Sequence, residues 1–105
     1  MAAGANIQLP GKNRMTPLII ASAYGHFDCV KWLLDSGAKI LLRDKFRRSA
    51  LIMAVRNGNV DIASLLLMRG SEFNGFDSSK NSAVHYAAAY GFPECIDLLI
   101  RAGAD

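Results

Sequence analysis

The chain has few residues of the types that build metal clusters, disulfide frameworks or rigid turns. Its 105 residues include two cysteines, two histidines and three prolines. No apolar run reaches the roughly 18 residues that a membrane-spanning helix needs. Residues 1–10 also lack the charged and apolar regions of a secretory signal. We therefore expect a protein without a membrane span, in the cytoplasm or the nucleus.

The signatures of catalysis and cofactor binding are also missing from the sequence. There is no glycine-rich phosphate-binding loop, no paired set of metal ligands, and no Ser/His/Asp combination with supporting context. His26 and Cys29 are spaced like two ligands on one helical turn, but no second pair accompanies them. We predict a protein that is not an enzyme and that holds no metal and no cofactor.

What the sequence does have is a period of 33 residues. The segment TPLIIASAYG at residues 16–25 returns as SALIMAVRNG at 49–58 and as SAVHYAAAYG at 82–91. Downstream, the units share a pair of large aliphatic residues and close on Gly-Ala or Gly-Ser at 37–38, 70–71 and 103–104. A self-similar period of this length is typical of a stacked array, in which each unit buries its apolar face against its neighbours.

The cysteines follow the same period. Cys29 and Cys95 lie two periods apart, so they occupy one position in the first and third units. If units stack about 10 Å apart, as packed helices do, about 20 Å separates the two sulfurs, which is beyond disulfide reach. We predict two free thiols.

These residues resemble the ankyrin repeat, whose pattern runs T-P-L-H-x-A-A-x-x-G-H-x-x-x-V-x-x-L-L-x-x-G-A. The resemblance implies an all-α solenoid of stacked helix–turn–helix units joined by β-hairpin-like loops. Residues 1–105 then form a single domain, with a partial repeat at 1–11 and repeats at about 12–44, 45–77 and 78–105. Both ends are cut at the same phase of the repeat, so we expect a fragment of a longer array.

Each unit predicts two short helices. In the first unit, Thr16 can cap a helix that starts at Pro17 and ends at Gly25, where glycine can adopt a left-handed conformation. A second helix follows from about Phe27 to Ser36. Such short helices do not persist alone in water, so their stability must come from stacking. On the second helices, we expect Trp32 and Met68 to be partly buried between units.

The sequence departs from the family pattern at two places. The family histidine occurs only as His85, which we expect to share hydrogen bonds with Ser82. The hairpin glycine two positions before T-P-L is replaced by Arg14, Arg47 and Lys80. A long side chain in a left-handed turn costs about 1 kcal/mol or more. These connectors are therefore expected to use a different turn from the family norm.

The resemblance implies a binding module that recognises other proteins through its hairpin tips and the concave side of its inner helices. Six positive charges accompany Asp44 alone between residues 39 and 56. Carried over residue by residue, the predicted partner-binding residues are Lys12, Arg14, Met15 and Tyr24 in the first unit, Lys45, Phe46, Arg47, Arg48, Arg56 and Asn57 in the second, and Lys80, Asn81 and Tyr90 in the third.

The basic surface has more than one interpretation. Its charges could form a solvated edge that keeps the array soluble. They could instead bind an acidic partner protein, with Phe46, Tyr24 or Tyr90 as apolar anchors. A phosphoinositide head group or nucleic acid is the alternative ligand, although a net charge of only +3 argues against such an anion binder.

Two further expectations concern assembly. The chain could be the regulatory ankyrin domain of a larger enzyme or channel. By itself, we expect it to be a monomer, or to associate weakly through its uncapped ends, because no polar capping repeat is evident in the sequence.

Overall fold

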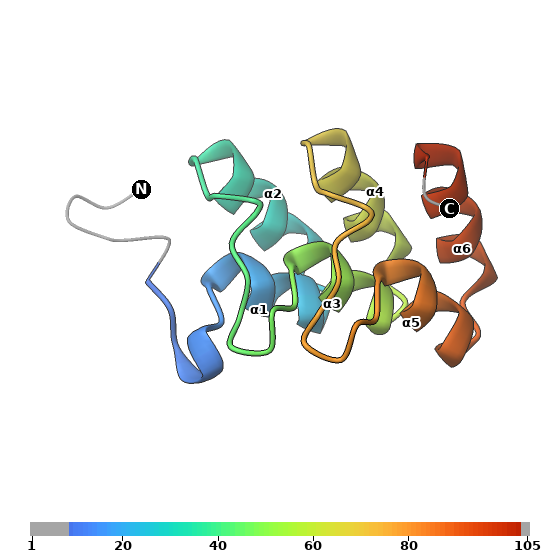
Figure 1. Cartoon of the computed structure of the whole chain (residues 1–105). Helices are drawn as coiled ribbons and strands as arrows, with labels where there is room; N and C mark the ends of the chain where they lie inside the picture. The colour runs from blue at the N-terminus through green and yellow to red at the C-terminus, as the bar shows by residue number, and fades with distance from the viewer. Residues whose placement is uncertain (1–8, 104–105) are drawn as a thin grey trace.

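The computed structural model describes residues 9–103, in which six α-helices follow one another as three helix–turn–helix pairs (Figure 1). The predicted partial repeat at residues 1–11 lies largely outside the described residues, as do Ala104 and Asp105. A short 3-10 helix comes first. The elements are η1 (Lys12–Arg14), α1 (Pro17–Tyr24), α2 (Phe27–Asp35), α3 (Ala50–Arg56), α4 (Val60–Met68), α5 (Ala83–Tyr90) and α6 (Pro93–Ala102).

A hydroxyl residue precedes the first helix of each pair and caps it. The hydroxyl oxygen of Thr16 accepts the backbone N–H of Ile19 at 3.3 Å, and Ser49 makes the equivalent bond to Ile52 at 3.1 Å. In the third pair, the backbone N–H of Ser82 donates to Nδ1 of His85 at 3.0 Å. The predicted hydrogen bonding between Ser82 and His85 is confirmed.

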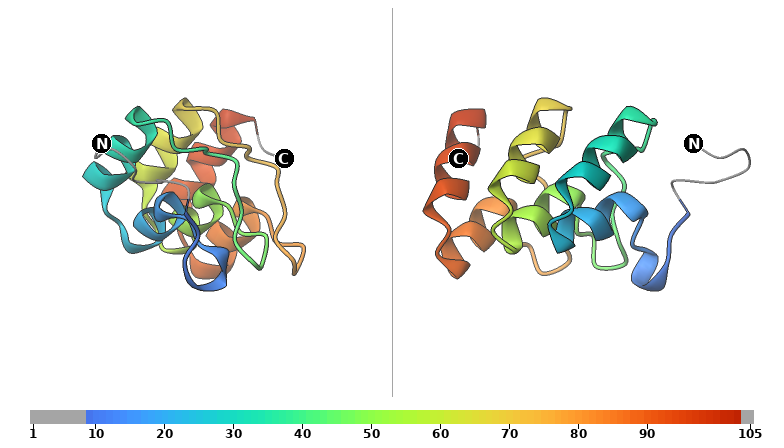
Figure 2. Two further views of the ribbon diagram at one scale, coloured as in Figure 1. Left: turned by 90° about the vertical axis from the view of Figure 1, so that its left-hand side faces the viewer. Right: turned by 180° about the vertical axis from the view of Figure 1, so that it is seen from behind.

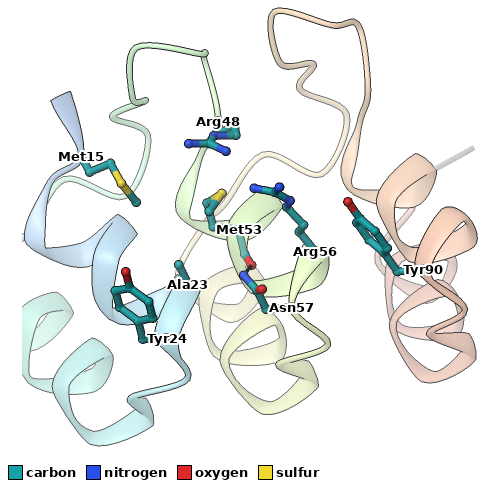
Figure 3. A pocket seen from close by; sticks show the side chains of 8 residues that line it. All are labelled: Met15, Ala23, Tyr24, Arg48, Met53, Arg56, Asn57 and Tyr90. Carbon is teal, nitrogen blue, oxygen red and sulfur yellow. Dashed lines mark hydrogen bonds between the residues drawn. The ribbon is translucent and has the colours of Figure 1, made fainter. Parts of the chain in front are cut away.

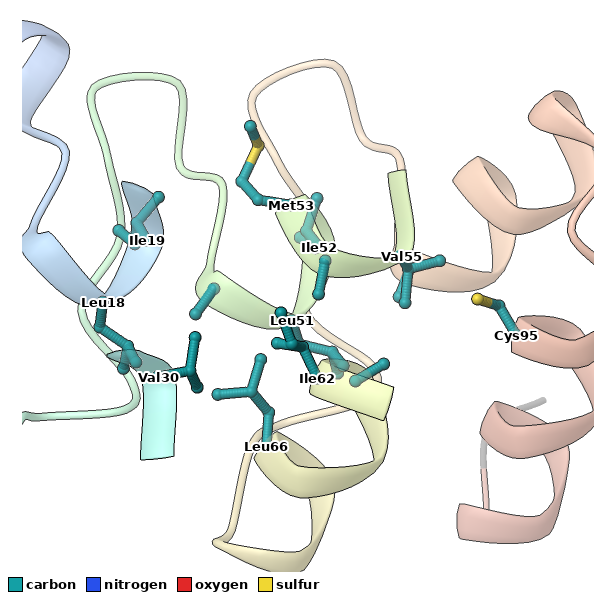
Figure 4. Packing of buried hydrophobic residues seen from close by; sticks show 14 of the residues in the cluster. Leu18, Ile19, Val30, Leu51, Ile52, Met53, Val55, Ile62, Leu66 and Cys95 are labelled. Atoms are coloured by element: carbon teal, nitrogen blue, oxygen red, sulfur yellow. The ribbon is translucent and has the colours of Figure 1, made fainter. Parts of the chain in front are cut away.

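The helix pairs form two rows. Helices α1, α3 and α5 lie side by side in one row, with α2, α4 and α6 in a second row behind them (Figures 1 and 2). The repeating alanines Ala21, Ala54 and Ala87 are all buried, and a small side chain at this position allows neighbouring helices to approach closely. Figure 4 shows the apolar side chains that fill the space between the pairs. The predicted all-α solenoid is confirmed.

The loops between pairs extend to one side as hairpins. Within residues 9–103, β pairing is limited to an isolated antiparallel bridge between Arg43 and Ser49. The hairpin tips are joined to one another through the backbone: the N–H of Lys45 donates to the carbonyl of Asn13 at 2.7 Å, and that of Ser78 to the carbonyl of Phe46 at 2.9 Å. The tips therefore stand in register along the array.

The prediction of a different hairpin turn is wrong. Arg14, Arg47 and Lys80 have φ of 60°, 62° and 66°, in the left-handed region that glycine favours. In all three connectors the N–H of this residue donates to the carbonyl three residues back, at 3.0 Å. The shared hydrogen bonding holds this left-handed turn although glycine is absent from all three connectors, and the long side chains remain exposed.

The expected partial burial of Trp32 and Met68 is also wrong. Trp32 is 50% exposed and Met68 is 81% exposed. Met68 stands one period after Asp35 and one period before Arg101, at a position of the second helix that faces solvent in every unit. Trp32 is different, because the residues one and two periods later, Leu65 and Leu98, are half-buried.

Cys29 is exposed and Cys95 is buried, and both are free thiols, as predicted. Burial raises the pKa of the Cys95 thiol, and the charge of Glu94 adds to the shift. Among the described residues, no helix is long and apolar enough to cross a membrane. Nor do three or more His, Cys, Asp or Glu side chains gather into a metal-binding group in residues 9–103.

Candidate functional site

An open groove of about 500 Å³ crosses the row of inner helices (Figure 3). None of its lining residues comes from the second helices α2, α4 and α6. Met15 and Arg48 reach it from the segments that precede α1 and α3. The other lining residues come from the three inner helices and the residue that caps the end of α3: Ala23, Tyr24, Met53, Arg56, Asn57 and Tyr90.

The 33-residue period explains the shape of the groove. Tyr24, Asn57 and Tyr90 occupy one position of the repeat, so a tyrosine stands at each end of the groove (Figure 3). The preceding position holds Ala23 in the first unit and Arg56 in the second. A long side chain in the middle unit is thus flanked by small residues, which leaves space around its guanidinium group.

The charge of the groove comes from Arg48 and Arg56, and its lining includes no carboxylate. Arg48 is partly neutralised, because its Nε donates to Oδ2 of Asp44 at 2.7 Å and its guanidinium group lies 4.9 Å from the ring centroid of Phe46. Arg56 forms no ion pair within residues 9–103. Its guanidinium group lies over the Tyr86 ring, at 5.9 Å from the centroid.

Aromatic rings at the two ends of the groove are open to solvent. Tyr24 is 73% exposed and Tyr90 is 52% exposed. Tyr90 stacks on Tyr86 with 6.1 Å between ring centroids and an interplanar angle of 13°. Tyr86 in turn donates its hydroxyl to Asp77. The Tyr90 ring is therefore held in place by Tyr86, whereas the Tyr24 ring is more exposed.

The ionisation of Asp77 and Tyr86 is coupled through this hydrogen bond. Burial alone would raise the pKa of Asp77, but the Tyr86 hydroxyl and the backbone N–H groups of Asn81 and Ser79 outweigh burial and hold it below its usual value. Burial, together with the Asp77 carboxylate, raises the pKa of Tyr86. Near neutral pH, Asp77 is a carboxylate and Tyr86 a phenol, which favours their hydrogen bond.

The hairpin tips form a second candidate surface. A hollow of about 450 Å³ lies between the first two tips, and Arg14, Lys45 and Arg47 are among its lining residues. Lys12 and Lys80 are exposed on their own tips. Phe46 is exposed beside the guanidinium group of Arg48.

The structure thus divides the predicted partner-binding residues between two surfaces. The groove brings together Met15, Tyr24, Arg48, Arg56, Asn57 and Tyr90. The tips carry Lys12, Arg14, Lys45, Phe46, Arg47 and Lys80. Asn81 lies at the base of the third hairpin, half-buried, where its backbone N–H donates to Asp77 at 2.9 Å.

Sequence reasoning overlooked three residues of these surfaces. Met53 lines the middle of the groove, on the turn of α3 before Arg56. Asp44 and Asp77 are buried and fix the hairpins below the tips. The period contained a signal for the aspartates, because they stand 33 residues apart at one position of the repeat.

Comparison with known families agrees with the repeat seen in the sequence and in the fold. A family model described as ankyrin repeats in many copies matches residues 1–34 and 18–67. A second model, described as an ankyrin repeat, matches residues 79–105. No curated protein matches the chain.

Proposed function

The chain belongs to the ankyrin repeat family, and from that premise we propose that it binds an acidic segment of a partner protein along the groove across α1, α3 and α5. Ankyrin repeats are generally protein–protein interaction modules and are typically non-catalytic. The observation that carries the proposal is the combination of two arginines, no carboxylate and two exposed tyrosines in one groove.

Arg56 is the residue that selects an acidic ligand. Its guanidinium group has no carboxylate partner within residues 9–103, so a carboxylate brought by a ligand meets an unneutralised charge. The face of Tyr86 already restrains this side chain, which lowers the entropy lost when it binds. A ligand that covers the groove also excludes water, and this strengthens the charge-assisted hydrogen bond.

Tyr24 and Tyr90 provide the apolar contacts at the two ends. Tyrosine is enriched among residues that dominate binding energy, because a rigid ring buries a large area with little loss of conformational freedom. Met15, Met53 and Ala23 give the floor between the rings an apolar surface that adapts to the shape of a ligand.

The basic tips serve association rather than selection. Lys45, Arg47 and Lys80 are exposed on hairpins that stand in register beside the groove. Solvated charges of this kind raise the association rate of an acidic partner more than they raise its final affinity.

Stacking geometry sets the length of the bound segment. Packed helices lie about 10 Å apart, so Tyr24 and Tyr90, two units apart, are separated by about 20 Å. An extended peptide rises about 3.3 Å per residue, so the two side chains that meet the rings stand about six positions apart. An acidic residue two or four positions after the first apolar anchor points to the same side and meets the arginines.

Selection of random peptides displayed on phage against the folded chain tests this proposal. We expect enriched peptides to carry apolar residues about six positions apart with an acidic residue between them. Arg56→Gln should weaken the enriched peptides about tenfold or more, because it removes the unpaired charge. The matched control is Arg101→Gln, which removes an exposed charge on α6, outside the groove, and should change binding little.

Two outcomes would contradict the proposal. Equal binding by the wild type and Arg56→Gln would show that Arg56 does not contribute to recognition. Alternatively, vesicles with a phosphoinositide or a labelled oligonucleotide could bind tightly at low salt and lose affinity steeply as salt increases. If Lys45→Glu with Arg47→Glu then abolished binding while Arg56→Gln did not, the tips would be the site of an anionic ligand instead.

A further inference from the structure

Within the described residues, the first helix pair, α1–α2, carries an open apolar hollow of about 590 Å³. Ile20 and Ala21 line it from the inner helix, and Cys29, Trp32 and Leu33 from the second helix. Cys29 and Trp32 are both exposed in this hollow. Large apolar surface on one face of a protein marks a site of interaction.

The same positions are covered elsewhere in the chain. One period after the exposed Cys29, Ile62 is buried where α3 and α4 pack against α1 and α2. One period later still, Cys95 is buried as well. The repeat therefore shows what fits this face, which is the far side of another helix pair of the same kind.

Within residues 9–103, the last helix pair, α5–α6, presents that far side without a further pair against it. Leu18 and Ser22 are buried in the first unit, whereas Val84, at the position of Leu18 two periods later, is half-buried. Ala88, at the position of Ser22, is exposed. On the second helix of this unit, Ile100 is 57% exposed.

The hairpin tips continue the same pattern. The carbonyls of Asn13 and Phe46 accept an N–H from the next tip. Ser79 occupies the same position of the repeat in the third tip. The donors Lys45 and Ser78 also share one position of the repeat, and Lys12 occupies that position in the first tip.

We propose that the chain associates with itself head to tail, with the α1–α2 face of one copy on the α5–α6 face of the next. The contact repeats the interface that already joins the units inside one chain, so both its shape and its apolar character are matched. The interface is heterologous, because it joins two different faces. Each contact leaves one face free on each outer copy, so further copies can add. Each unit contacts only its neighbours, and a single such contact is weak.

Trp32 is the only tryptophan in the chain and lies in the proposed interface, so it reports on association directly. Sedimentation of the 105-residue chain should show a mass that increases with concentration between about 1 µM and 1 mM, the range of weak complexes. Over the same range, tryptophan emission should move to shorter wavelength as the indole leaves water. A monomer with unchanged emission at the highest concentration would overturn the proposal.

Two variants separate a head-to-tail contact from a symmetric one. Trp32→Glu blocks the α1–α2 face and Ile100→Glu blocks the α5–α6 face, and each alone should be monomeric. An equimolar mixture should form a one-to-one dimer that grows no further, because each variant keeps the face that the other lacks. If Ile100→Glu alone still dimerised through its Trp32 face, the head-to-tail arrangement would be wrong.

The matched control is Met68→Glu, which places the same charge on an exposed apolar residue of α4, in the middle unit of the array. It should associate like the wild type. All three replaced side chains are at least half exposed, so the far-ultraviolet circular dichroism of each variant should match that of the wild type. A loss of association by Met68→Glu equal to that of Trp32→Glu would also contradict the proposal.

Discussion

Asp44 and Asp77 stand 33 residues apart, and their carboxylates hold adjacent hairpins with the same pair of hydrogen bonds. In each case, Oδ1 accepts the backbone N–H groups of the second and fourth residues that follow, at distances of 2.8–2.9 Å. The connector before α1 has Gly11 at this position and keeps only the backbone hydrogen bonds. The carboxylates therefore reinforce a turn that the backbone already forms.

The second oxygen of each carboxylate finds a different partner. Oδ2 of Asp44 accepts Nε of Arg48 at 2.7 Å, whereas Oδ2 of Asp77 accepts the hydroxyl of Tyr86. Asn81 replaces arginine in the third hairpin, and a tyrosine on α5 supplies the missing donor. This hydrogen bond joins the third hairpin to α5 through Tyr86, the residue on which Tyr90 of the groove stacks.

Asp77→Asn should lower the free energy of unfolding by about 1–3 kcal/mol at neutral pH, because it weakens hydrogen bonds to a buried charged acceptor. Chemical denaturation followed by circular dichroism measures the change. Asp97→Asn is the control, since it removes an exposed carboxylate that pairs with Arg101 on the same helix and should have little effect.

The effect of Asp77 should depend on pH. Its pKa in the folded chain lies below the ordinary value of 3.8, so its carboxylate contributes stability above that value. This contribution is lost as the pH falls through the lower folded pKa. The difference in stability between wild type and Asp77→Asn should therefore narrow in acid, and a difference that stayed constant down to the acid transition would contradict this assignment.

Arg47→Gly should stabilise the chain by about 0.5–1 kcal/mol. Arg47 has a left-handed backbone, which strains a residue with a side chain. Relief of this strain outweighs the larger conformational entropy that glycine gives the unfolded chain. The exposed Lys45 on the same tip provides the comparison, since its backbone is not left-handed. Lys45→Gly removes the same charge and should instead be destabilising. The two variants should shift the midpoint of urea unfolding in opposite directions.

The helices could be predicted from the sequence because their signals are local and occur three times. Thr16, Ser49 and Ser82 mark helix starts by a capping chemistry that needs no knowledge of the rest of the chain. The turn at Arg47 could not be predicted in this way. Local strain opposes it, and it forms because hydrogen bonds across the hairpin outweigh that strain.

The surface was harder to predict than the fold. The resemblance to the ankyrin repeat implied that Tyr24, Arg56 and Tyr90 share one face, and they do line one groove. Their environment depends on contacts between units, which the period does not specify. Trp32, for example, is half exposed on the first described helix pair, whereas the residues at the same position in later units are half-buried.

Ala54→Arg tests the burial on which the stack depends. Ala54 is fully buried on α3 between its neighbours, so a charged side chain there should cost about 3 kcal/mol or more and uncouple the outer units. Ala89→Arg is the matched control: Ala89 is exposed on α5, at the position where α3 itself carries Arg56. Thermal unfolding should show an early, broadened transition for the first variant and a wild-type transition for the second.

Gly58 and Gly91 separate backbone strain from steric contact. Both have φ of +73°, so alanine at either position pays about 1 kcal/mol for a left-handed backbone. A Cβ at Gly58 would lie 2.8 Å from the ring of Phe92, whereas one at Gly91 would meet nothing within 4 Å. Gly58→Ala should therefore destabilise the chain by about 1–3 kcal/mol more than Gly91→Ala, because the ring must move at the interface between the last two units. Equal losses in denaturation experiments would mean that Phe92 rearranges freely, and that the second and third units are packed less tightly than the structure indicates.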